Sequence, residues 1–434
     1  MSQLLITNIG LMPVDRHHKP FLRGSEMSQP DILHNAWLLI EDDRIKDFGE
    51  GEPQLSALNS QLSTLNSKLS TLNSKLLTLN SNGSAVLPSF CDPHTHLVYA
   101  DSREGEFVDK IRGLSYAEIA RRGGGILNSA DRLHALSEDE LFRQAMLRVD
   151  EIISKGTGAV EIKSGYGLNT ADELKMLRVI RRIRDAVPIP VVATFLGAHA
   201  VPRGMSKDAY VNLIINEMLP EVARQQLADY IDVFCDEGFF TADDTRRILE
   251  AGLTYGLRGK IHGQELADSG GVEVAIECGA LSVDHLESMT DADIQLLNEE
   301  FRVNSSLPSI PTALPGTSFF LNMPFAPARR IIDSGLPLAL ASDYNPGSTP
   351  SGDMKFVLSL ACIKQRLLPE EAFTAATLNA ACAMGLSRDY GSIAVGKVAN
   401  FIVTEPIPSL AYVPYAYTSP LIRKVFLRGE EYNS

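Results

Sequence analysis

Five of the chain's nine histidines occur in short motifs through the middle of its 434 residues. Two of them form the motif His94-Thr95-His96, which follows the apolar run Ala85-Val86-Leu87. Alternate residues of a strand point to the same side, so both imidazoles can reach one metal ion. The pattern predicts a strand that ends in a pair of metal ligands.

Later apolar runs also end in histidine or aspartate. Those that lead to His262 and Asp343 would complete a site of three imidazoles and one carboxylate with His94 and His96. Such a set suits Zn²⁺ or iron, and an open position would hold a water whose pKa the metal lowers toward neutrality. Each motif alone is weaker evidence, because a lone Asp343 could simply cap a helix or close a turn.

Two further residues are candidates for acid–base work beside this site. Glu265 follows His262 by three residues, so its carboxylate can point back at a bound water and carry a proton to a leaving nitrogen. The alternative is a surface glutamate at the start of a helix, favoured by the helix dipole. His285 could stabilise a developing oxyanion or orient the water, or it could be a satisfied core histidine.

A third group could bind an acidic substrate. Arg103 offers a guanidinium for a carboxylate, although a surface salt bridge with Glu104 or Glu106 explains it equally well. The motif Gly165-Tyr166-Gly167 lets the backbone approach a ligand and offers it a hydroxyl. Residues 345–349 add amides and hydroxyls beside Asp343.

The elements that must position these residues alternate between strand and helix. Helical patterns, such as 172–186, 206–226 and 242–251, separate eight strand candidates. The candidates are 86–90, 159–163, 191–196, 231–235, 259–261, 281–284, 301–305 and 338–341. Eight such units predict an α/β fold, a (β/α)8 barrel of the TIM type, whose chemistry takes place at the carboxyl ends of the strands.

Both ends of the chain contain short strand-like runs, for example 36–40 and 391–403. They predict a small β-sandwich domain assembled from both termini, with its N-terminal part at 1–85 and its C-terminal part at 391–434. The barrel would then occupy 86–390.

Residues 55–81 repeat a seven-residue unit, with leucines that alternate steps of three and four. This spacing is that of a short coiled coil. Most other positions are Ser, Thr and Asn, which are poor helix formers, and the units are nearly identical. We therefore favour a low-complexity insertion in a surface loop of the small domain.

Composition excludes several classes of function. The net charge of −14 argues against a nucleic-acid or anionic-membrane surface, so an anionic substrate would need a local cationic patch. The five scattered cysteines form no CxxC pair and indicate a reducing compartment. No signal peptide or membrane span is visible, which leaves the cytoplasm as the expected location.

Four motifs together resemble the amidohydrolase superfamily, and within it the imidazolonepropionase family. They are Asp92-Pro93-His94-Thr95-His96-Leu97, Lys163-Ser164-Gly165-Tyr166-Gly167-Leu168, Leu196-Gly197-Ala198-His199-Ala200 and Asp343-Tyr344-Asn345-Pro346-Gly347. The resemblance covers nearly the whole chain apart from the repeat. It implies a barrel beside a β-sandwich, and hydrolysis of the cyclic amide of 4-imidazolone-5-propanoate to N-formimidoyl-L-glutamate.

The same resemblance implies one Zn²⁺ or Fe³⁺ ion, with His94, His96, His262 and Asp343 as ligands. It implies a catalytic role for Glu265, His285 and Asp343. It places substrate contacts at Arg103, Tyr166, His199, Glu265, His285, Asn345, Gly347 and Ser348, with Thr349 as an alternative to Ser348. Binuclear relatives carry a carbamylated lysine after strand 4, where this chain has no lysine, which favours a mononuclear site.

Two other functions remain open at this level. A mononuclear aminohydrolase that deaminates a nucleobase would share the metal motifs. Arg103 and the Gly-Tyr-Gly motif favour an acidic substrate, and the resemblance implies a small anionic imidazolone. A non-catalytic scaffold that recruits a partner through the repeat would be expected to have lost ligands, and all four are present. The sequence allows a homodimer without requiring one.

Overall fold

A computed structural model describes residues 3–53, 76–114, 118, 124–303 and 308–433. Its centre is a parallel eight-stranded sheet whose strands are neighbours in chain order. The strands are β6 (Phe90–Asp92), β7 (Thr157–Lys163), β8 (Val191–Ala198), β9 (Tyr230–Cys235), β10 (Arg258–Gly263), β11 (Ser282–His285), β12 (Ile310–Ala313) and β13 (Ala339–Leu340). A parallel bridge between Thr95 and Tyr344 joins the segments that follow the first and last strands, so the sheet closes into a barrel. The predicted (β/α)8 class is confirmed.

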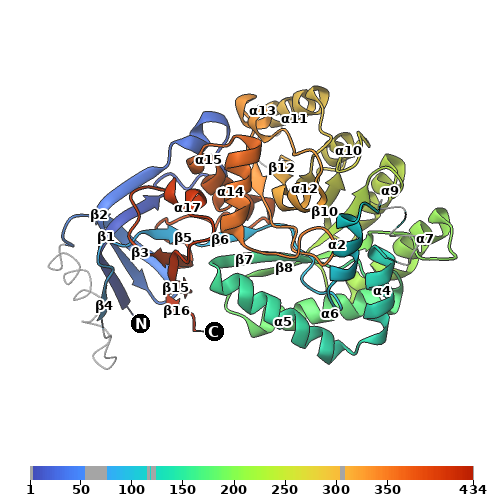
Figure 1. Ribbon diagram of the computed structural model, residues 1–434, viewed down its shortest axis with the longest axis horizontal. Coiled ribbons are helices and arrows are strands. Elements are labelled where there is room, and N and C mark those ends of the chain that lie inside the picture. The colour runs from blue at the N-terminus through green and yellow to red at the C-terminus, as the bar shows by residue number, and fades with distance from the viewer. Residues whose placement is uncertain (1–2, 54–75, 115–117, 119–123, 304–307, 434) are drawn as a thin grey trace.

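Helices surround the barrel (Figure 1). Those that precede the last strand are α2 (Glu104–Ile111), α4 (Ile126–Ala135), α5 (Glu138–Ser154), α6 (Thr170–Ala186), α7 (Lys207–Leu213), α8 (Leu219–Gln225), α9 (Ala242–Leu253), α10 (Gly271–Glu277), α11 (Asp291–Val303), α12 (Pro315–Leu321) and α13 (Ala328–Asp333). The helices α14 (Met354–Gln365), α15 (Pro369–Ala375), α16 (Leu378–Ala383) and α17 (Tyr412–Tyr415) follow it. Among the described residues no helix is long and apolar enough to cross a membrane.

Helix α6 shows why these segments fold as they do. Leu174, Leu177, Ile180 and Ile183 recur every third residue and are all buried, as expected for an amphipathic helix on a sheet. The side chain of Asn169 accepts a hydrogen bond from the backbone N–H of Asp172 and caps the first turn.

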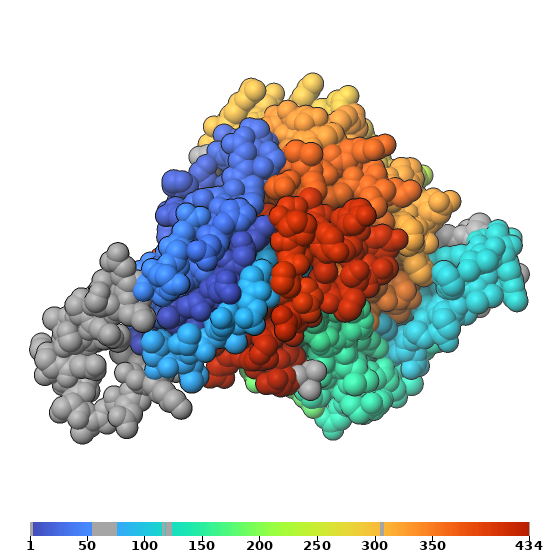
Figure 2. All heavy atoms as spheres, turned by 60° about the vertical axis from the view of Figure 1, so that its left-hand side comes forward, coloured from blue at the N-terminus to red at the C-terminus, as the bar shows by residue number. Residues whose placement is uncertain are grey.

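The two ends of the chain meet in a pair of four-stranded sheets. One contains β1 (Gln3–Val14), β2 (Asp31–Glu41), β3 (Arg44–Glu50) and β4 (Leu76–Asn80), and the other contains β5 (Val86–Pro88), β14 (Phe401–Thr404), β15 (Ile422–Leu427) and β16 (Glu430–Glu431). Buried residues of both sheets, such as Ile6, Leu38, Val86 and Phe426, share one apolar core. Figure 2 shows the N-terminal and C-terminal segments in contact on one face of the molecule. The predicted small β-sandwich is therefore present, while the limits proposed for the domains stay a prediction.

Two strand predictions need correction. The predicted strand 86–90 is divided, because residues 86–88 form β5 of the small sheet and β6 of the barrel begins at Phe90. The predicted strand 301–305 is wrong: Phe301 lies near the end of α11, and the seventh barrel strand is β12. Phe301 is buried together with Leu297, four residues earlier, which is a helical period. The alternation of apolar and polar residues at 301–304 imitates a strand.

The leucine repeat lies largely outside the described residues. Its last unit includes β4, which pairs in parallel with β1. Leu76 and Leu77 of this strand are exposed. The choice between a coiled coil and a surface insertion for the remainder stays a prediction.

A strand of the small domain leads directly into the first strand of the barrel. Only Ser89 separates β5 from β6, so packing of the small sheet constrains the strand that leads to His94. Phe401 pairs with Pro88 in the register of this sheet and stacks on Phe426 with ring centres 4.7 Å apart.

Phe401→Ala should therefore destabilise the protein. Both rings are buried, and truncation of a buried phenylalanine typically costs about 3–5 kcal/mol of unfolding free energy. Urea unfolding followed by circular dichroism measures the change, with the exposed Tyr415→Ala as a control expected within about 0.5 kcal/mol of the parent. Equal unfolding midpoints for the two variants would contradict this account.

Candidate metal centre and substrate cavity

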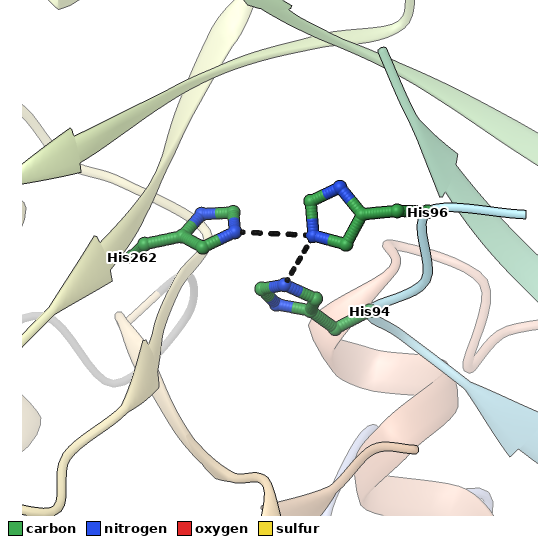
Figure 3. Close-up of side chains that lie close together, drawn as sticks. All are labelled: His94, His96 and His262. Carbon is green, nitrogen blue, oxygen red and sulfur yellow. Dashed lines mark hydrogen bonds between the residues drawn. The ribbon is translucent and has the colours of Figure 1, made fainter. Parts of the chain in front are cut away.

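Three histidines meet at the carboxyl end of the barrel (Figure 3). His94 and His96 follow β6, and His262 lies in β10. The Nε2 atom of His96 is 3.3 Å from Nε2 of His94 and 3.4 Å from Nε2 of His262. Two nitrogens bound to one tetrahedral zinc ion are separated by roughly 3.3 Å, so these distances suit a shared metal ion.

Asp343 approaches the same centre from the loop after β13. Its Oδ1 atom lies 3.7 Å from His94 Nε2 and 3.6 Å from His96 Nε2. Its Oδ2 atom accepts hydrogen bonds from the hydroxyls of Thr317, at 2.5 Å, and Ser348, at 3.1 Å. The backbone of Asp343 has a φ of 55°, a strained value that is common where a site imposes the geometry.

The other ring nitrogens explain how the imidazoles are oriented. Nδ1 of His94 lies 2.7 Å from a carboxylate oxygen of Asp284, and Nδ1 of His262 lies 3.0 Å from Asp232. A proton on Nδ1 of His94, directed at Asp284, leaves the lone pair of that ring on Nε2. Burial lowers the pKa of His94 well below its usual value, so its ring is neutral as a ligand must be. The donor set therefore fits a metal ion.

Beneath the histidines lies a network of buried charges that sequence analysis missed. Lys163 Nζ is 2.6 Å from Glu161 Oε1, 2.7 Å from Asp232 Oδ2 and 3.6 Å from Asp284 Oδ2. Lys260 donates to the second carboxylate oxygen of Glu161. All five side chains are fully buried, and buried charges persist only when they are paired.

Strand periodicity carried a signal for this network. Lys260 lies two residues before His262, and Glu161 two residues before Lys163, so each pair points into the same space. Charged residues at alternate positions of a buried apolar strand are rare unless they face partners.

Glu265 and His285 lie side by side in the site. His285 Nδ1 is 3.7 Å from a carboxylate oxygen of Glu265 and 3.7 Å from one of Glu287. Burial raises the pKa of Glu265 to about 7, against the opposing effect of His285. Burial alone would lower the pKa of His285, but the two carboxylates outweigh it and raise the pKa. A carboxyl group with a pKa near neutrality is suited to accept and return a proton.

Asp236 holds the loop that carries Glu265. One of its carboxylate oxygens accepts the backbone N–H groups of Glu265, at 2.8 Å, and Leu266, at 2.9 Å. Asp236 follows β9, the fourth barrel strand, where binuclear relatives were expected to carry a lysine. Here that position anchors a loop.

A cavity of about 580 Å³ opens above the histidines. His94 lies behind its wall, and the other residues predicted for the site line the cavity: His96, Arg103, Tyr166, His199, His262, Glu265, His285, Asp343, Asn345, Gly347 and Ser348. The ring of His199 stacks on that of His96, with centres 5.1 Å apart and planes 12° apart. The structure thus brings the predicted residues together, from strands spread over most of the chain.

The structure bears on two alternatives that the sequence left open, the hydroxyl beside Asp343 and the pairing of Arg103. Ser348 lines the cavity, whereas the hydroxyl of Thr349 lies 3.0 Å from that of Thr317. Arg103 does pair with Glu106, at 2.7 Å, but this pair is nearly buried at the cavity wall and does not lie on the open surface.

Comparison with known proteins places the chain in a family. The sequence model of the amidohydrolase family matches residues 85–431. An imidazolonepropionase of Christiangramia forsetii is 49% identical over 432 residues, which cover 98% of this chain and 99% of that protein. The chain belongs to the imidazolonepropionase family of the amidohydrolases. The imidazolonepropionase of Flavobacterium johnsoniae is 48% identical, with 98% and 99% coverage.

Solved structures of two deaminases agree with the fold of this imidazolonepropionase family member. The 5-methylcytosine deaminase of Klebsiella pneumoniae superposes with a TM-score of 0.72 at 15% identity, over 98% of this chain and 96% of that one. The guanine deaminase of C. acetobutylicum gives 0.68 at 14% identity, over 99% of each chain. At such identities the likeness concerns the fold alone.

Asp284→Asn should weaken metal binding. The amide cannot carry the negative charge that orients His94, and loss of such a partner typically lowers metal affinity about 10- to 100-fold. Competition with a chromogenic chelator measures the affinity, and the exposed Asp243→Asn serves as the control. An unchanged affinity in Asp284→Asn would show that His94 does not depend on this carboxylate.

Proposed function

We propose that this protein hydrolyses the cyclic amide bond of 4-imidazolone-5-propanoate, as a step of histidine degradation. Water adds across the bond between the ring carbonyl carbon and the ring nitrogen. The hydroxyl joins the carbon, which becomes a carboxylate, and the proton joins the nitrogen, which gives N-formimidoyl-L-glutamate. The observation that carries the proposal is one cavity that holds a metal-type cluster, a carboxylate at Glu265 and a cation at Arg103, in a chain up to 49% identical to imidazolonepropionases.

The metal in this proposal is one zinc or iron ion. His94, His96, His262 and Asp343 would hold it. The donor atoms of the three histidines lie within 4.8 Å of one another, and Asp343 Oδ1 lies 3.7 Å from His94 and 3.6 Å from His96. When bound, such an ion lowers the pKa of water and polarises a carbonyl group. The five free thiols suit the reducing cytoplasm, where we expect the enzyme to act, and a homodimer stays a prediction.

The chain's own groups account for the proton transfers. Glu265 accepts the proton of the attacking water and returns it to the ring nitrogen, for which a pKa near neutrality is suited. His285 lies beside it and donates a hydrogen bond to the oxygen that becomes negative. Asp343 assists by accepting a hydrogen bond from the water.

The cavity wall accounts for binding. Arg103 holds the propionate arm through charge-assisted hydrogen bonds. Tyr166, His199 and Asn345 enclose the ring, and Gly347 and Ser348 complete the wall. A nucleobase has no carboxylate for Arg103 to bind, so the position of this cation at the cavity wall favours the acidic substrate.

Glu265→Gln should remove turnover but keep the metal. The amide cannot accept a proton, and loss of a general acid–base group typically costs about 100- to 10,000-fold in kcat. The loss of ultraviolet absorbance of 4-imidazolone-5-propanoate follows the reaction, and elemental analysis gives the metal content. The exposed Glu237→Gln is the control. Full activity of Glu265→Gln would remove Glu265 from the mechanism, and ammonia release from nucleobases by the parent would favour the alternative function.

Arg103→Ala should mainly raise KM. A hydrogen bond to a charged group contributes about 1.5–3 kcal/mol, which corresponds to about a 10- to 150-fold change in KM. Arg103→Ala also leaves the Glu106 carboxylate without its cation. The double variant Arg103→Ala/Glu106→Gln removes that unpaired charge, so the rise in KM that persists in it reports lost substrate binding. The exposed Arg143→Ala is the control. A KM equal to that of the parent would count against the anchor.

A further inference from the structure

The charge of Arg103 at the cavity wall is balanced by Glu106, a residue of the helix that follows it. Nε and one terminal nitrogen of Arg103 donate to the same oxygen of Glu106, at 3.0 Å and 2.7 Å. The second oxygen of Glu106 accepts the backbone N–H of Gly125, at 3.1 Å, and the side-chain amide of Asn128, at 3.0 Å. Glu106 therefore fixes the orientation of the guanidinium and also cancels its charge, so this pair alone attracts an anion only weakly.

A second cation lies one helical turn after Glu106. Lys110 of α2 is half-buried and lines the same cavity. Its ammonium donates to the backbone oxygen of Gly347, at 2.9 Å, and lies 5.5 Å from the centre of the Phe320 ring. Within the part of the chain that the structure describes, no carboxylate forms an ion pair with it.

Arg103 and Lys110 both lie beside the backbone of Gly347. A methyl group added at Gly347 would overlap the guanidinium of Arg103, and the carbonyl oxygen of the same residue accepts the bond from Lys110. The two charged groups thus flank Gly347 on one side of the cavity. Stacking of Phe107 on Phe320, with ring centres 5.2 Å apart, holds α2 against α12 and keeps Lys110 at this position.

The environment of Lys110 favours an anion. Burial and, to a smaller extent, Arg103 lower the pKa of Lys110 to about 8, against the opposing effect of Glu106. A partly desolvated ammonium without a counter-charge is costly, and a bound carboxylate would remove that cost. Arg103, Glu106 and Lys110 together carry one net positive charge, which matches one carboxylate.

We propose that Lys110 and Arg103 together form the carboxylate subsite of the cavity, in which Arg103 supplies directed hydrogen bonds and Lys110 supplies the net charge. Lys110 is then a binding residue that determines specificity for substrates with an acidic side arm. The inference deepens the proposed function and rests on it for the identity of the substrate.

Binding of 3-(imidazol-4-yl)propanoate and of its neutral methyl ester tests this subsite, by calorimetry at pH 7 on the metal-loaded protein. The two probes share the ring, so any contact of the imidazole with the metal cancels in their comparison. Lys110→Gln keeps a donor for Gly347 but removes the charge, and it should lower the affinity for the acid at least tenfold and leave the ester unchanged. Lys110→Arg should retain the preference for the acid, and Lys46→Gln, on β3 of the small domain, should match the parent.

Equal affinity of the parent for acid and ester, or an unchanged preference in Lys110→Gln, would overturn the proposal. Loss of binding for both probes in Lys110→Gln would also overturn it, because that pattern indicates a structural role. Turnover separates this result from the proposed function. A parent that prefers the acid through Lys110 but does not hydrolyse 4-imidazolone-5-propanoate would keep the subsite and refute the reaction.

Discussion

The ammonium of Lys163 lies between the carboxylates of Asp232 and Asp284 at the centre of the barrel. Each carboxylate turns to a different histidine, Asp284 to His94 and Asp232 to His262. Lys163 thus positions two carboxylates, and each carboxylate lies against a predicted metal ligand from a different part of the sheet. Removal of one partner from a buried ion pair typically costs about 3–5 kcal/mol, so the arrangement is held as a unit.

The buried charges and the histidines above them meet two opposite electrostatic requirements. The imidazoles must be neutral to offer lone pairs, and burial lowers the pKa of His94 and His96, which keeps these two rings neutral. Burial alone would raise the pKa of Asp232 below them, but His262 and Lys163 lower it, so this carboxylate stays charged. A layer of paired charges under a layer of neutral donors satisfies both needs within the interior of a single barrel.

The cavity extends this separation of charge along its length. Acidic and imidazole groups lie around the predicted metal ligands, whereas Arg103, just before α2, and Lys110, within it, lie at the wall. A substrate with a carboxylate on one end and a polarised carbonyl on the other would be oriented by these two regions. The negative charge of the whole chain does not prevent this, because local cations dominate inside a cavity of low dielectric.

Much of this could be predicted from sequence, because the signals are local. The motif His94-Thr95-His96 depends only on strand periodicity, and α6 only on an apolar repeat and a cap. The seventh strand was misplaced, since apolar and polar residues alternate at 301–304, and the helical period of Phe301 appears only with Leu297. Local patterns of this length do not distinguish a buried strand from the buried face of a helix.

The tertiary structure alone decided which charges meet. Asp284 and His94 are 190 residues apart in the chain, and Lys110 and Gly347 are 237 apart, so no local pattern relates them. The sequence determined which side chains end each strand. Closure of the barrel decided their partners, because buried charges are stable only where the fold brings an opposite charge or a hydrogen-bond acceptor within reach.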